Sequence, residues 1–528
     1  MYPGTFAESS PALPAVIMGG SGEVVTYRDL DGRSNRIAHL LRRQGLRPGD
    51  TLAVLSGNRP EVFDLAWAAQ RSGLQLTMVN HHLTPEESAY IVGDSGARVV
   101  AATRDLAGTA EALRPGELPS IERRLMIGGT IPGWEAYEEA LEGMPETPIP
   151  DECEGDIMLY SSGTTGRPKG IRREVRATPM GTHPDVPGHW LRESLGMRPG
   201  DVYLCPAPLY HAAPLAWSMA CHRTGSTVVV MERFDAEETL RLIERHKVTH
   251  GQWVPTMFVR MLKLPGEARH RYDLSSLRWA VHAAAPCPVP VKRRMIEWWG
   301  PILFEFYSAT EGIGATAITS EEWLRKPGSV GRPLMGRPHV LDEHGGELPP
   351  GEVGVVWFEG GTPFEYRGDP GKTAAATNRR GWRTVGDMGR LDEDGFLYLT
   401  DRAINLIISG GVNIYPQEVE NVLVDHPDAA DAAVLGVPDP EMGEQVKAVV
   451  QLEEGRPADA DTAGRLFEHC RAHLAGYKCP RSIEFTGEPL RTPAGKIRKE
   501  PLKQRFGIGP GTFTRPGNEP VRASESTN

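Results

Sequence analysis

The sequence predicts an α/β protein: a large N-terminal domain of doubly wound sheets with a β-rich subdomain, and a smaller α+β C-terminal domain joined by a hinge. The chain has 528 residues, and a single hydrophobic core rarely grows beyond about 300 residues, so at least two domains are expected. Strands alternate with helices of similar length through the first half, as in parallel sheets. Short strands among turns replace this pattern after about residue 340.

Apolar runs and helical periodicity locate the elements of the N-terminal half. The segment from Tyr27 to Gln44 reads as an amphipathic helix that Gly45 ends, since glycine tolerates the left-handed conformation past a helix end. Short apolar runs bounded by turn residues predict buried strands. The other helices expected here are 61–73, 85–95 and 236–246, and the strands are 51–55, 75–79, 98–102, 227–231, 250–254 and 277–282.

The C-terminal part is expected to contain the β-rich subdomain and then a compact α+β unit. The predicted strands are 353–359, 395–400, 406–409, 431–437 and 445–452, and the predicted helices are 417–424 and 461–473. These elements divide the chain into an N-terminal domain over 1–401 and a mobile C-terminal domain over 402–506. Residues 507–528 are rich in Gly, Pro, Ser and Thr and are expected to form a disordered tail.

The composition argues against several classes of function. A net charge of −11 disfavours a general nucleic-acid-binding protein, which usually carries a basic surface. The six cysteines form no C-x-x-C pair, so we expect reduced thiols in a cytoplasmic protein rather than a zinc or disulfide scaffold. The sequence has neither a signal-peptide pattern nor an apolar run long enough to span a bilayer, so no integral membrane segment is expected. The sequence leaves open whether the protein forms a homodimer.

The strongest motif is the segment YSSGTTGRPKG, which begins at Tyr160. Its glycines permit close backbone approach, its hydroxyls donate hydrogen bonds and its lysine adds positive charge, as a polyphosphate ligand requires. It is not a Walker A loop, because Pro168 stands where a glycine is required and no Ser or Thr follows the lysine. A flexible loop without a ligand is the alternative. The candidate phosphate-binding residues are Ser161, Ser162, Gly163, Thr164, Thr165, Gly166 and Lys169.

This loop resembles the phosphate loop of the adenylate-forming superfamily, which comprises acyl- and aryl-CoA synthetases, luciferases and peptide-synthetase adenylation domains. Other segments resemble the family's motifs in the same order, so the resemblance covers about residues 24–505. It is nearest to bacterial fatty-acid or aryl-acid CoA ligases. The resemblance implies that ATP, with Mg²⁺, activates a carboxylic acid as an acyl-adenylate, and that the acyl group then passes to coenzyme A.

Two segments resemble the family's adenine and phosphate motifs. In HAAAP, the small side chains of Ala284 and Ala285 would allow the adenine to approach the backbone. In YSATEG, Tyr307 would stack on the adenine and Thr310 would contact phosphate. Glu311 would hold the magnesium ion, which prefers hard oxygen ligands.

The segments GWRTVGD and DRAINLIISGG resemble the ribose motif and the hinge with its following loop. Asp387 would accept hydrogen bonds from both ribose hydroxyls, and Arg402 would be a second ribose or phosphate contact. Ile404 occupies the hinge position, where the family usually has lysine or aspartate. Gly410 and Gly411 would let the loop enter the active site for the thiol step.

Two further segments resemble motifs that act on the acid. In PLYH, His211 would border the tunnel for the substrate carboxylate. In RTPAGK, Lys496 would be the adenylation lysine, which contacts the carboxylate and the α-phosphate. On the small domain, Lys478 and Arg481 would either bind the phosphates of CoA or be ordinary surface charges.

The expected wall of the acyl pocket is mainly apolar or small. It offers no lysine or arginine for a second carboxylate, and no aspartate follows PLYH to bind an α-amino group. We therefore expect medium-to-long acyl chains, slightly ahead of cinnamate-like acids, and no amino acid. The 174–190 insertion is interpreted as a surface loop rather than a lid. The candidate wall residues are His211, Ala212, Trp253, Val254, Thr256, Met257, Val281, Ala284, Ser308, Ala309 and Ile313, with Ser308 in place of the usual glycine.

An ATP-dependent acyl-CoA ligase is therefore the function that the resemblance implies. The alternatives in the same family are an aryl-acid CoA ligase, a ligase that loads a carrier-protein thiol, and a luciferase-type oxygenase. A non-catalytic binding protein is supported only by the departures at Val385, Ile404 and Leu490, because Glu311 and Lys496 stand at their motif positions.

Overall fold

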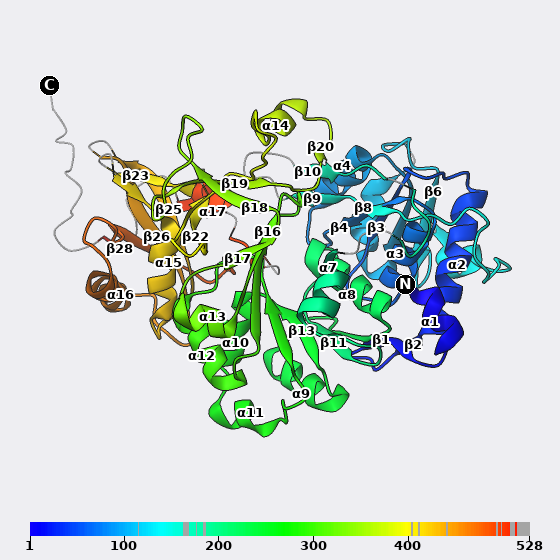
Figure 1. Ribbon diagram of the computed structural model, residues 1–528, viewed down its shortest axis with the longest axis horizontal. Coiled ribbons are helices and arrows are strands. Elements are labelled where there is room, and N and C mark those ends of the chain that lie inside the picture. The colour runs from blue at the N-terminus through cyan, green and yellow to red at the C-terminus, as the bar shows by residue number, and fades with distance from the viewer. Residues whose placement is uncertain are drawn as a thin grey trace.

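The structure is a computed structural model that describes residues 1–114, 116–161, 168–175, 177–182, 186–402, 405–409, 412–439, 442–492, 495–497, 499–506 and 513–514. The strands of this part form five sheets. Figure 1 shows the small C-terminal domain, in yellow to red, at the end of the molecule away from the blue N-terminal sheet. The central sheet, mainly green, lies between them.

The N-terminal sheet has strand order β7-β6-β5-β3-β4-β8, and its pairs are parallel. Strands β3 and β4 are buried at every position, which explains their continuous apolar runs. Helices α2 and α4 begin with capping boxes in which Thr26 and Thr84 bond with the acidic residue three positions later. The elements are α2 (Tyr27–Arg43), β3 (Thr51–Leu55), α3 (Glu61–Arg71), β4 (Gln75–Val79), α4 (Pro85–Ser95), β5 (Ala97–Thr103), β6 (Arg123–Ile127), β7 (Glu135–Ala136) and β8 (Asp156–Ile157).

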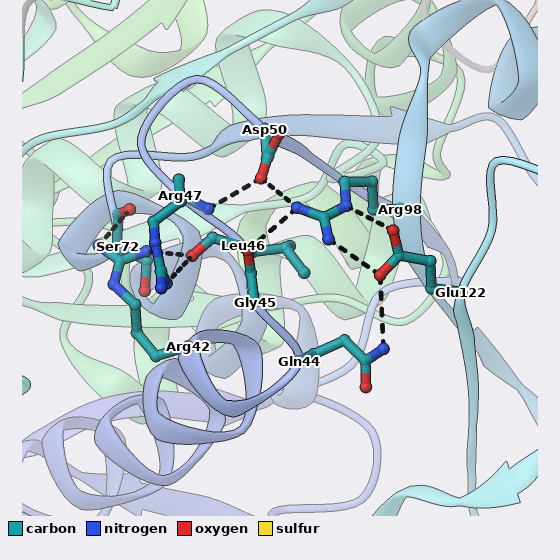
Figure 2. Close-up of polar contacts among 9 residues, drawn as sticks. All are labelled: Arg42, Gln44, Gly45, Leu46, Arg47, Asp50, Ser72, Arg98 and Glu122. Atoms are coloured by element: carbon teal, nitrogen blue, oxygen red, sulfur yellow. Dashed lines mark hydrogen bonds and ion pairs between the residues drawn. The ribbon is translucent and has the colours of Figure 1, made fainter.

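Charged residues fasten the edge of this sheet at which the strands begin (Figure 2). The Arg98 guanidinium, on β5, donates to Asp50 Oδ2 at 2.6 Å and to the Gly45 carbonyl at 3.1 Å. The same guanidinium makes a bidentate pair with Glu122, just before β6, at 2.8 and 2.9 Å. Arg42, at the end of α2, donates to the Leu46 carbonyl at 3.0 Å. Arg98 thus joins the starts of three neighbouring strands, β3, β5 and β6. These contacts do not involve the carboxyl ends of the strands, where parallel sheets usually bind ligands.

The central sheet has strand order β17-β16-β15-β14-β13-β11-β12-β1-β2. The six strands from β15 to β1 run parallel, and antiparallel strands close both edges. The strands are β1 (Pro14–Met18), β2 (Val24–Thr26), β11 (Val202–Cys205), β12 (Thr227–Val230), β13 (His250–Trp253), β14 (Trp279–His282), β15 (Leu303–Ser308), β16 (Ala315–Thr319) and β17 (Arg332–Met335), and the main helices are α8 (Ala212–Thr224), α9 (Ala236–His246), α10 (Pro255–Leu262) and α12 (Val289–Trp299).

The two faces of the central sheet belong to different cores, because side chains alternate across a strand. Val281 and Phe306 pack in the core under α8. Trp253, Ala280 and Leu303 pack on the other face, with residues of α10 and α12. This separation decides which side chains can meet a ligand bound on either face.

The β-rich subdomain consists of a four-stranded and a three-stranded sheet, and the small domain is built on another sheet. The small-domain core includes Val419, Val434 and Phe467. The subdomain strands are β9 (Leu159–Ser161), β10 (Lys169–Arg172), β18 (Arg337–Leu341), β19 (Gly354–Glu359), β20 (Glu365–Tyr366), β21 (Asp387–Leu391) and β22 (Leu397–Arg402). The small-domain elements are β23 (Ile407–Ser409), β24 (Val412–Ile414), α15 (Pro416–Asp425), β25 (Ala429–Asp439), β26 (Gly443–Leu452), α16 (Ala460–His473), β27 (Ser482–Thr486), α17 (Lys499–Phe506) and β28 (Phe513–Thr514).

The observed elements confirm the α/β fold class, and the expected helix and strand boundaries agree with the observed ones to within two residues. The apolar run at 157–159 is split, with β8 in the N-terminal sheet and β9 in the phosphate-loop hairpin. Strand β22 ends at Arg402, one residue past the predicted boundary at 401. Phe513 and Thr514, in the expected disordered tail, pair with β27, and the Phe513 ring lies 5.1 Å from that of Phe485. The composition of the tail is mainly polar, and the prediction of disorder overlooked Phe513, whose ring makes an apolar contact with the small domain.

Within the described residues, every helix is too short or too polar to cross a lipid bilayer.

A buried histidine connects the two large sheets of the N-terminal domain. His222, on α8, has no exposed surface. Its Nδ1 accepts a hydrogen bond from Trp67 Nε1 at 3.1 Å, so the neutral ring donates from Nε2 to the Ala15 carbonyl at 3.2 Å. Desolvation lowers the pKa of His222 to about 3.

Replacing His222 with glutamine should make the free energy of unfolding depend less on pH below pH 6.5. The unfolded chain gains a proton near pH 6.5 that the folded chain resists until about pH 3. The stabilising contribution is therefore complete above pH 6.5 and falls on acidification, by up to about 1.4 kcal/mol per pH unit. Urea-unfolding midpoints at pH 7.5 and 4.5 measure this. His222→Gln should show the smaller decrease, whereas the control His344→Gln, at an 84% exposed side chain, should follow the unmodified protein. Equal decreases in all three proteins would contradict this role.

Candidate active site

The carboxyl ends of the strands of both sheets meet at one place, and Asn58 holds them together. This residue follows β3 of the N-terminal sheet and is 8% exposed. Its Nδ2 donates to the Ala207 carbonyl at 3.0 Å and to the Met231 carbonyl at 2.8 Å. Its Oδ1 accepts from the Leu209 backbone N–H at 2.8 Å. The loops after β11 and β12 of the central sheet are thereby fixed against the N-terminal sheet.

His211 lies at the end of this fixed loop and is the N-cap of α8. Its Nε2 is buried and has no hydrogen-bond partner among the described residues. Burial, and then the charge of Lys496, lower the pKa of His211 to about 3, so the ring is neutral at ordinary pH. The ring centroid of Tyr210 lies 4.3 Å from that of His211 and 5.2 Å from that of His81, so the three rings form one cluster. A neutral imidazole with an unsatisfied nitrogen suits a polar group of a ligand.

The predicted phosphate loop is the tip of a hairpin formed by β9 and β10. The tip, with Ser162, Gly163, Thr164, Thr165 and Gly166, lies outside the described residues, and so does the side chain of Ser161. The base of the hairpin is anchored to α4, where Tyr160 Oη donates to Asp94 Oδ2 at 2.6 Å.

Lys169, on β10, continues the base of this hairpin. Its Nζ lies 3.6 Å from Asp369 Oδ2. The Tyr90 hydroxyl donates to the Pro168 carbonyl at 3.2 Å. Hydrogen bonds and an ion pair therefore hold the two strands at the base of the hairpin against α4 and Asp369.

Two of the predicted nucleotide contacts touch one another. Tyr307 is the penultimate residue of β15 in the central sheet, and Asp387 begins β21 of the subdomain. The Tyr307 hydroxyl donates to Asp387 Oδ2 at 2.7 Å. Strand pairing sets Asp387 opposite Arg402 on β22. The structure thus gathers the proposed adenine residue and both proposed ribose residues at one junction.

Glu311 is a buried carboxylate that its neighbours orient. It is 8% exposed, and Tyr366 Oη donates to its Oε1 at 2.7 Å. Arg173 Nη2 donates to the carbonyl of the preceding Thr310 at 2.8 Å. Carboxylate oxygens are the ligands that Mg²⁺ prefers. In the described part of the chain, no three His, Cys, Asp or Glu side chains could hold a metal together, so a magnesium ion here fits Glu311 together with the oxygens of a bound polyphosphate.

The predicted adenine loop contains a strained residue. Ala284 has φ of +75°, in the left-handed region that residues with a Cβ rarely adopt. Such strain costs about 1–2 kcal/mol and is typical of ligand-binding loops. The exposed methyl group of Ala284 and the neighbouring Ala285 leave the backbone of this loop accessible.

The small domain brings Lys496 to the same place. Arg491 pairs with Asp431 at 2.9 Å and donates to the Gly495 carbonyl at 3.1 Å, which shapes the turn before the lysine. A Cβ added at Gly495 would lie 3.4 Å from Thr256 Oγ1 of the large domain. The turn therefore lies directly against the large domain, and Lys496 is near enough to His211 to lower its pKa.

A second contact between the domains lies at Lys263, at the end of α10. Its Nζ donates to the carbonyls of Ala429 and Ala430 at 3.5 Å and forms an ion pair with Glu453. These partners all belong to the small domain, so this arrangement of the domains is held at two separate points.

The expected acyl wall is only partly brought together. Trp253 has no exposed surface and packs on the α10 and α12 face, 5.1 Å from the Trp299 ring. The prediction that Trp253 and Val281 line one pocket is wrong, because Gln252 pairs with Val281 and successive side chains on β13 point to opposite faces. Val254 and Met257 lie in the core with Trp253.

The residues after β15 also differ from the expectation. Ile313 is 1% exposed and packs inside the β-rich subdomain with Phe358, so it does not line the pocket. Ala309 packs beside the same cluster. The Ser308 hydroxyl donates to the Gly314 carbonyl at 2.8 Å. His211, Ala212, Val281 and Ser308 remain as wall candidates on the α8 side.

The residues predicted for the thiol step are separated from this site or lie outside the described residues. Ile404, Gly410 and Gly411 are outside them. Lys478 Nζ is 2.7 Å from both carboxylate oxygens of Glu418. Arg481 is 3.7 Å from Asp439. Both candidates for CoA binding are thus paired with carboxylates in this domain arrangement.

Sequence reasoning missed four residues of the site. Asn58 carried a usable signal, since it is a polar residue directly after a buried strand, where parallel sheets place their sites. His81 and His82 had the same signal, because they follow β4. Tyr366 had none, because a Phe-Glu-Tyr stretch reads as an ordinary short strand.

Comparisons with known proteins agree with this geometry. The family model "AMP-binding enzyme" matches residues 5–365, and "AMP-binding enzyme C-terminal domain" matches 418–496. The chain is 34% identical to a fatty acid–[acyl-carrier-protein] ligase of Streptomyces coeruleorubidus, over 95% of each chain. It is 35% identical to a feruloyl-CoA synthase of Amycolatopsis sp, over 96% of this chain and 98% of the other. The o-succinylbenzoate CoA synthetase of Bacillus subtilis, solved with its acyl-adenylate, has a TM-score of 0.78 and 29% identity, over 95% of this chain and 97% of that one.

Replacing Asn58 with alanine should destabilise the large domain and disturb the site together. Two buried carbonyls and one N–H would lose their partner, and each unsatisfied buried group costs about 1–3 kcal/mol. We expect a loss of about 3 kcal/mol or more in the urea unfolding of this domain. The control Gln44→Ala, at an exposed side chain whose hydrogen bond to Glu122 is 3.5 Å long, should lose less than about 0.5 kcal/mol. Similar losses in both variants would show that Asn58 does not fasten the sheets.

Proposed function

Since the chain belongs to the AMP-binding enzyme family of adenylate-forming acid–thiol ligases, we propose that it is an acyl-CoA ligase that uses Glu311, His211 and Lys496 as its central residues. The observation that carries the proposal is the position of Lys496. A lysine of the small domain lies at the mouth of the large domain, close enough to His211 to lower its pKa. Two domains that share one site in this way suit a reaction with two half-steps.

In the first half-reaction, a carboxylate oxygen of the acid attacks the α-phosphorus of ATP. The bond from this phosphorus to the oxygen bridging to the β-phosphate breaks, and pyrophosphate leaves with the bonding pair. Lys496 would offset negative charge on the carboxylate and α-phosphate as this bond breaks. Neutral His211 would orient the acid without competing with Lys496 for its charge.

The nucleotide would be held by the junction of the two sheets and the subdomain. Tyr307 would stack on the adenine, and Asp387 would exchange its bond from the Tyr307 hydroxyl for bonds from the ribose. Glu311, held by Tyr366, would bind a magnesium ion that neutralises charge on the phosphate oxygens. The phosphate loop and Lys169 would hold the outer phosphates.

In the second half-reaction, the thiol sulfur of CoA attacks the acyl carbon, its proton leaves to solvent or a base, and AMP departs. We propose that Lys478 and Arg481 bind the CoA phosphates after their carboxylate partners have released them. A carrier-protein thiol is the alternative acceptor, supported by the similarity to the acyl-carrier-protein ligase.

Pyrophosphate release tests the proposed activity directly. It should require ATP, Mg²⁺ and a carboxylic acid, and multiple turnovers should require CoA. Release that turns over without CoA would point to a different acceptor. Absence of release with aliphatic, aryl and cyclic acids alike would contradict the proposed function.

Lys496→Ala should separate the two half-reactions. Loss of one charge that stabilises the transition state typically lowers a rate by about 10²–10³, so acyl-AMP formation should fall by about this factor. Thioester formation from supplied acyl-AMP and CoA should be retained within a few-fold. Lys503→Ala, on the nearby helix α17, is the matched control and should leave both rates unchanged. Equal loss of both half-reactions in Lys496→Ala would contradict the assigned role.

A further inference from the structure

Three aromatic side chains from different segments form a block on the α8 face of the central sheet. The rings of Trp217 and Phe306 are stacked, with centroids 5.4 Å apart and an interplanar angle of 21°. Trp190 lies 5.7 Å from Phe306 and 6.3 Å from Trp217. Their exposures are only 2%, 8% and 6% for Trp217, Phe306 and Trp190. We call these three residues the aromatic block.

The aromatic block lies below the candidate site on two elements at once. Phe306 precedes Ser308 by two residues on β15 and points to the same face, about 7 Å further in at 3.3 Å per residue. Trp217 follows His211 by six residues along α8, about 9 Å at 1.5 Å per residue. The contact between Trp217 and Phe306 closes the space between helix and sheet at that depth.

The wall above the block carries small side chains. Ala212 begins α8 beside His211, and Val281 lies on β14 in the same core as the aromatic block. The end of the 174–190 insertion is fixed here too, since Trp190 is buried within this core. A ligand that enters between His211 and Ser308 on this face therefore meets the three rings after about 7–9 Å.

We infer that the aromatic block is the floor of the acid pocket and that it restricts the enzyme to compact acids. A zigzag carbon chain advances by less than one C–C bond, about 1.5 Å, per carbon, so the depth admits about six carbons or one aromatic ring. The inference rests on the proposed function, because it assigns the acid carboxylate to Lys496 and His211. It names Trp190, Trp217 and Phe306 as the residues that determine specificity.

The opposite face of the same sheet provides a matched control. Trp253, Phe258 and Trp299 form an aromatic cluster there, with centroids 5.1–6.4 Å apart. Phe258 has no exposed surface, and the block residues, at 2–8% exposure, are also buried. Truncation of Phe258 should therefore destabilise the domain as truncation of Phe306 does, without changing the depth of the pocket.

The test compares kcat/KM for acid-dependent pyrophosphate release with hexanoate, cinnamate and dodecanoate. The unmodified enzyme should prefer hexanoate or cinnamate to dodecanoate by at least about tenfold, as for a pocket that excludes extra carbons. Phe306→Ala should raise kcat/KM for dodecanoate by about tenfold and lower it for hexanoate. Phe258→Ala should change both values by the same factor. Thermal unfolding of each variant shows whether it is folded, and Phe306→Val with Trp217→Phe replaces Phe306→Ala if that variant does not fold.

The outcomes separate this inference from the proposed function. Equal or faster use of dodecanoate by the unmodified enzyme would overturn the floor and leave the ligase proposal intact. A change in the dodecanoate-to-hexanoate ratio that is the same in the Phe306 and Phe258 variants would also overturn it. Absence of release with all three acids would overturn the proposed function, and the inference with it.

Discussion

One buried amide holds the two parallel sheets of the large domain edge to edge where their strands end. The three hydrogen bonds of Asn58 cross from the N-terminal sheet to two loops of the central sheet. Those loops fix the N-terminus of α8 and the ring of His211. A parallel sheet places its ligand-binding loops at the carboxyl ends of its strands, and Asn58 makes two such edges into one site. The positions that we propose for the acid and the nucleotide depend on this alignment.

The polar side chains of the site are held by one another. Tyr307 donates to Asp387, Tyr366 donates to Glu311, and Lys169 lies beside Asp369. These contacts limit the rotamers of groups that would otherwise lose conformational entropy on binding a nucleotide. In the proposed complex, each of these groups exchanges a hydrogen bond within the protein for one to the nucleotide. The free-energy cost of removing water from each group has therefore largely been incurred on folding.

Local patterns in the sequence were sufficient for much of the fold. Strands β3 and β4 and helices α4 and α9 have the predicted boundaries, because apolar runs, capping residues and turn residues are all local signals. The pairing of Tyr307 with Asp387 could not be predicted, since it joins residues 80 positions apart. The assignment of Trp253 to the pocket failed for a related reason. A sequence shows that a strand is buried on both sides, but only the packing of helices decides which side meets the ligand. The three-ring contact below the site is likewise made by segments distant in sequence, so the preference for compact acids that we propose differs from the longer chains that an apolar composition suggested.

The two faces of the central sheet differ in how well they tolerate substitution. On the α10 and α12 face, Lys292 pairs with Glu305 and lies over the ring of Trp323, and replacing either charged residue would leave the other buried without its partner. On the α8 face, the contacts below the site are apolar, and apolar side chains of similar total volume can be exchanged at modest cost. If the α8 face binds the acid as we propose, a few substitutions on that face can change which acid is accepted during evolution. The α10 and α12 face, left unchanged, keeps the large domain folded while this happens.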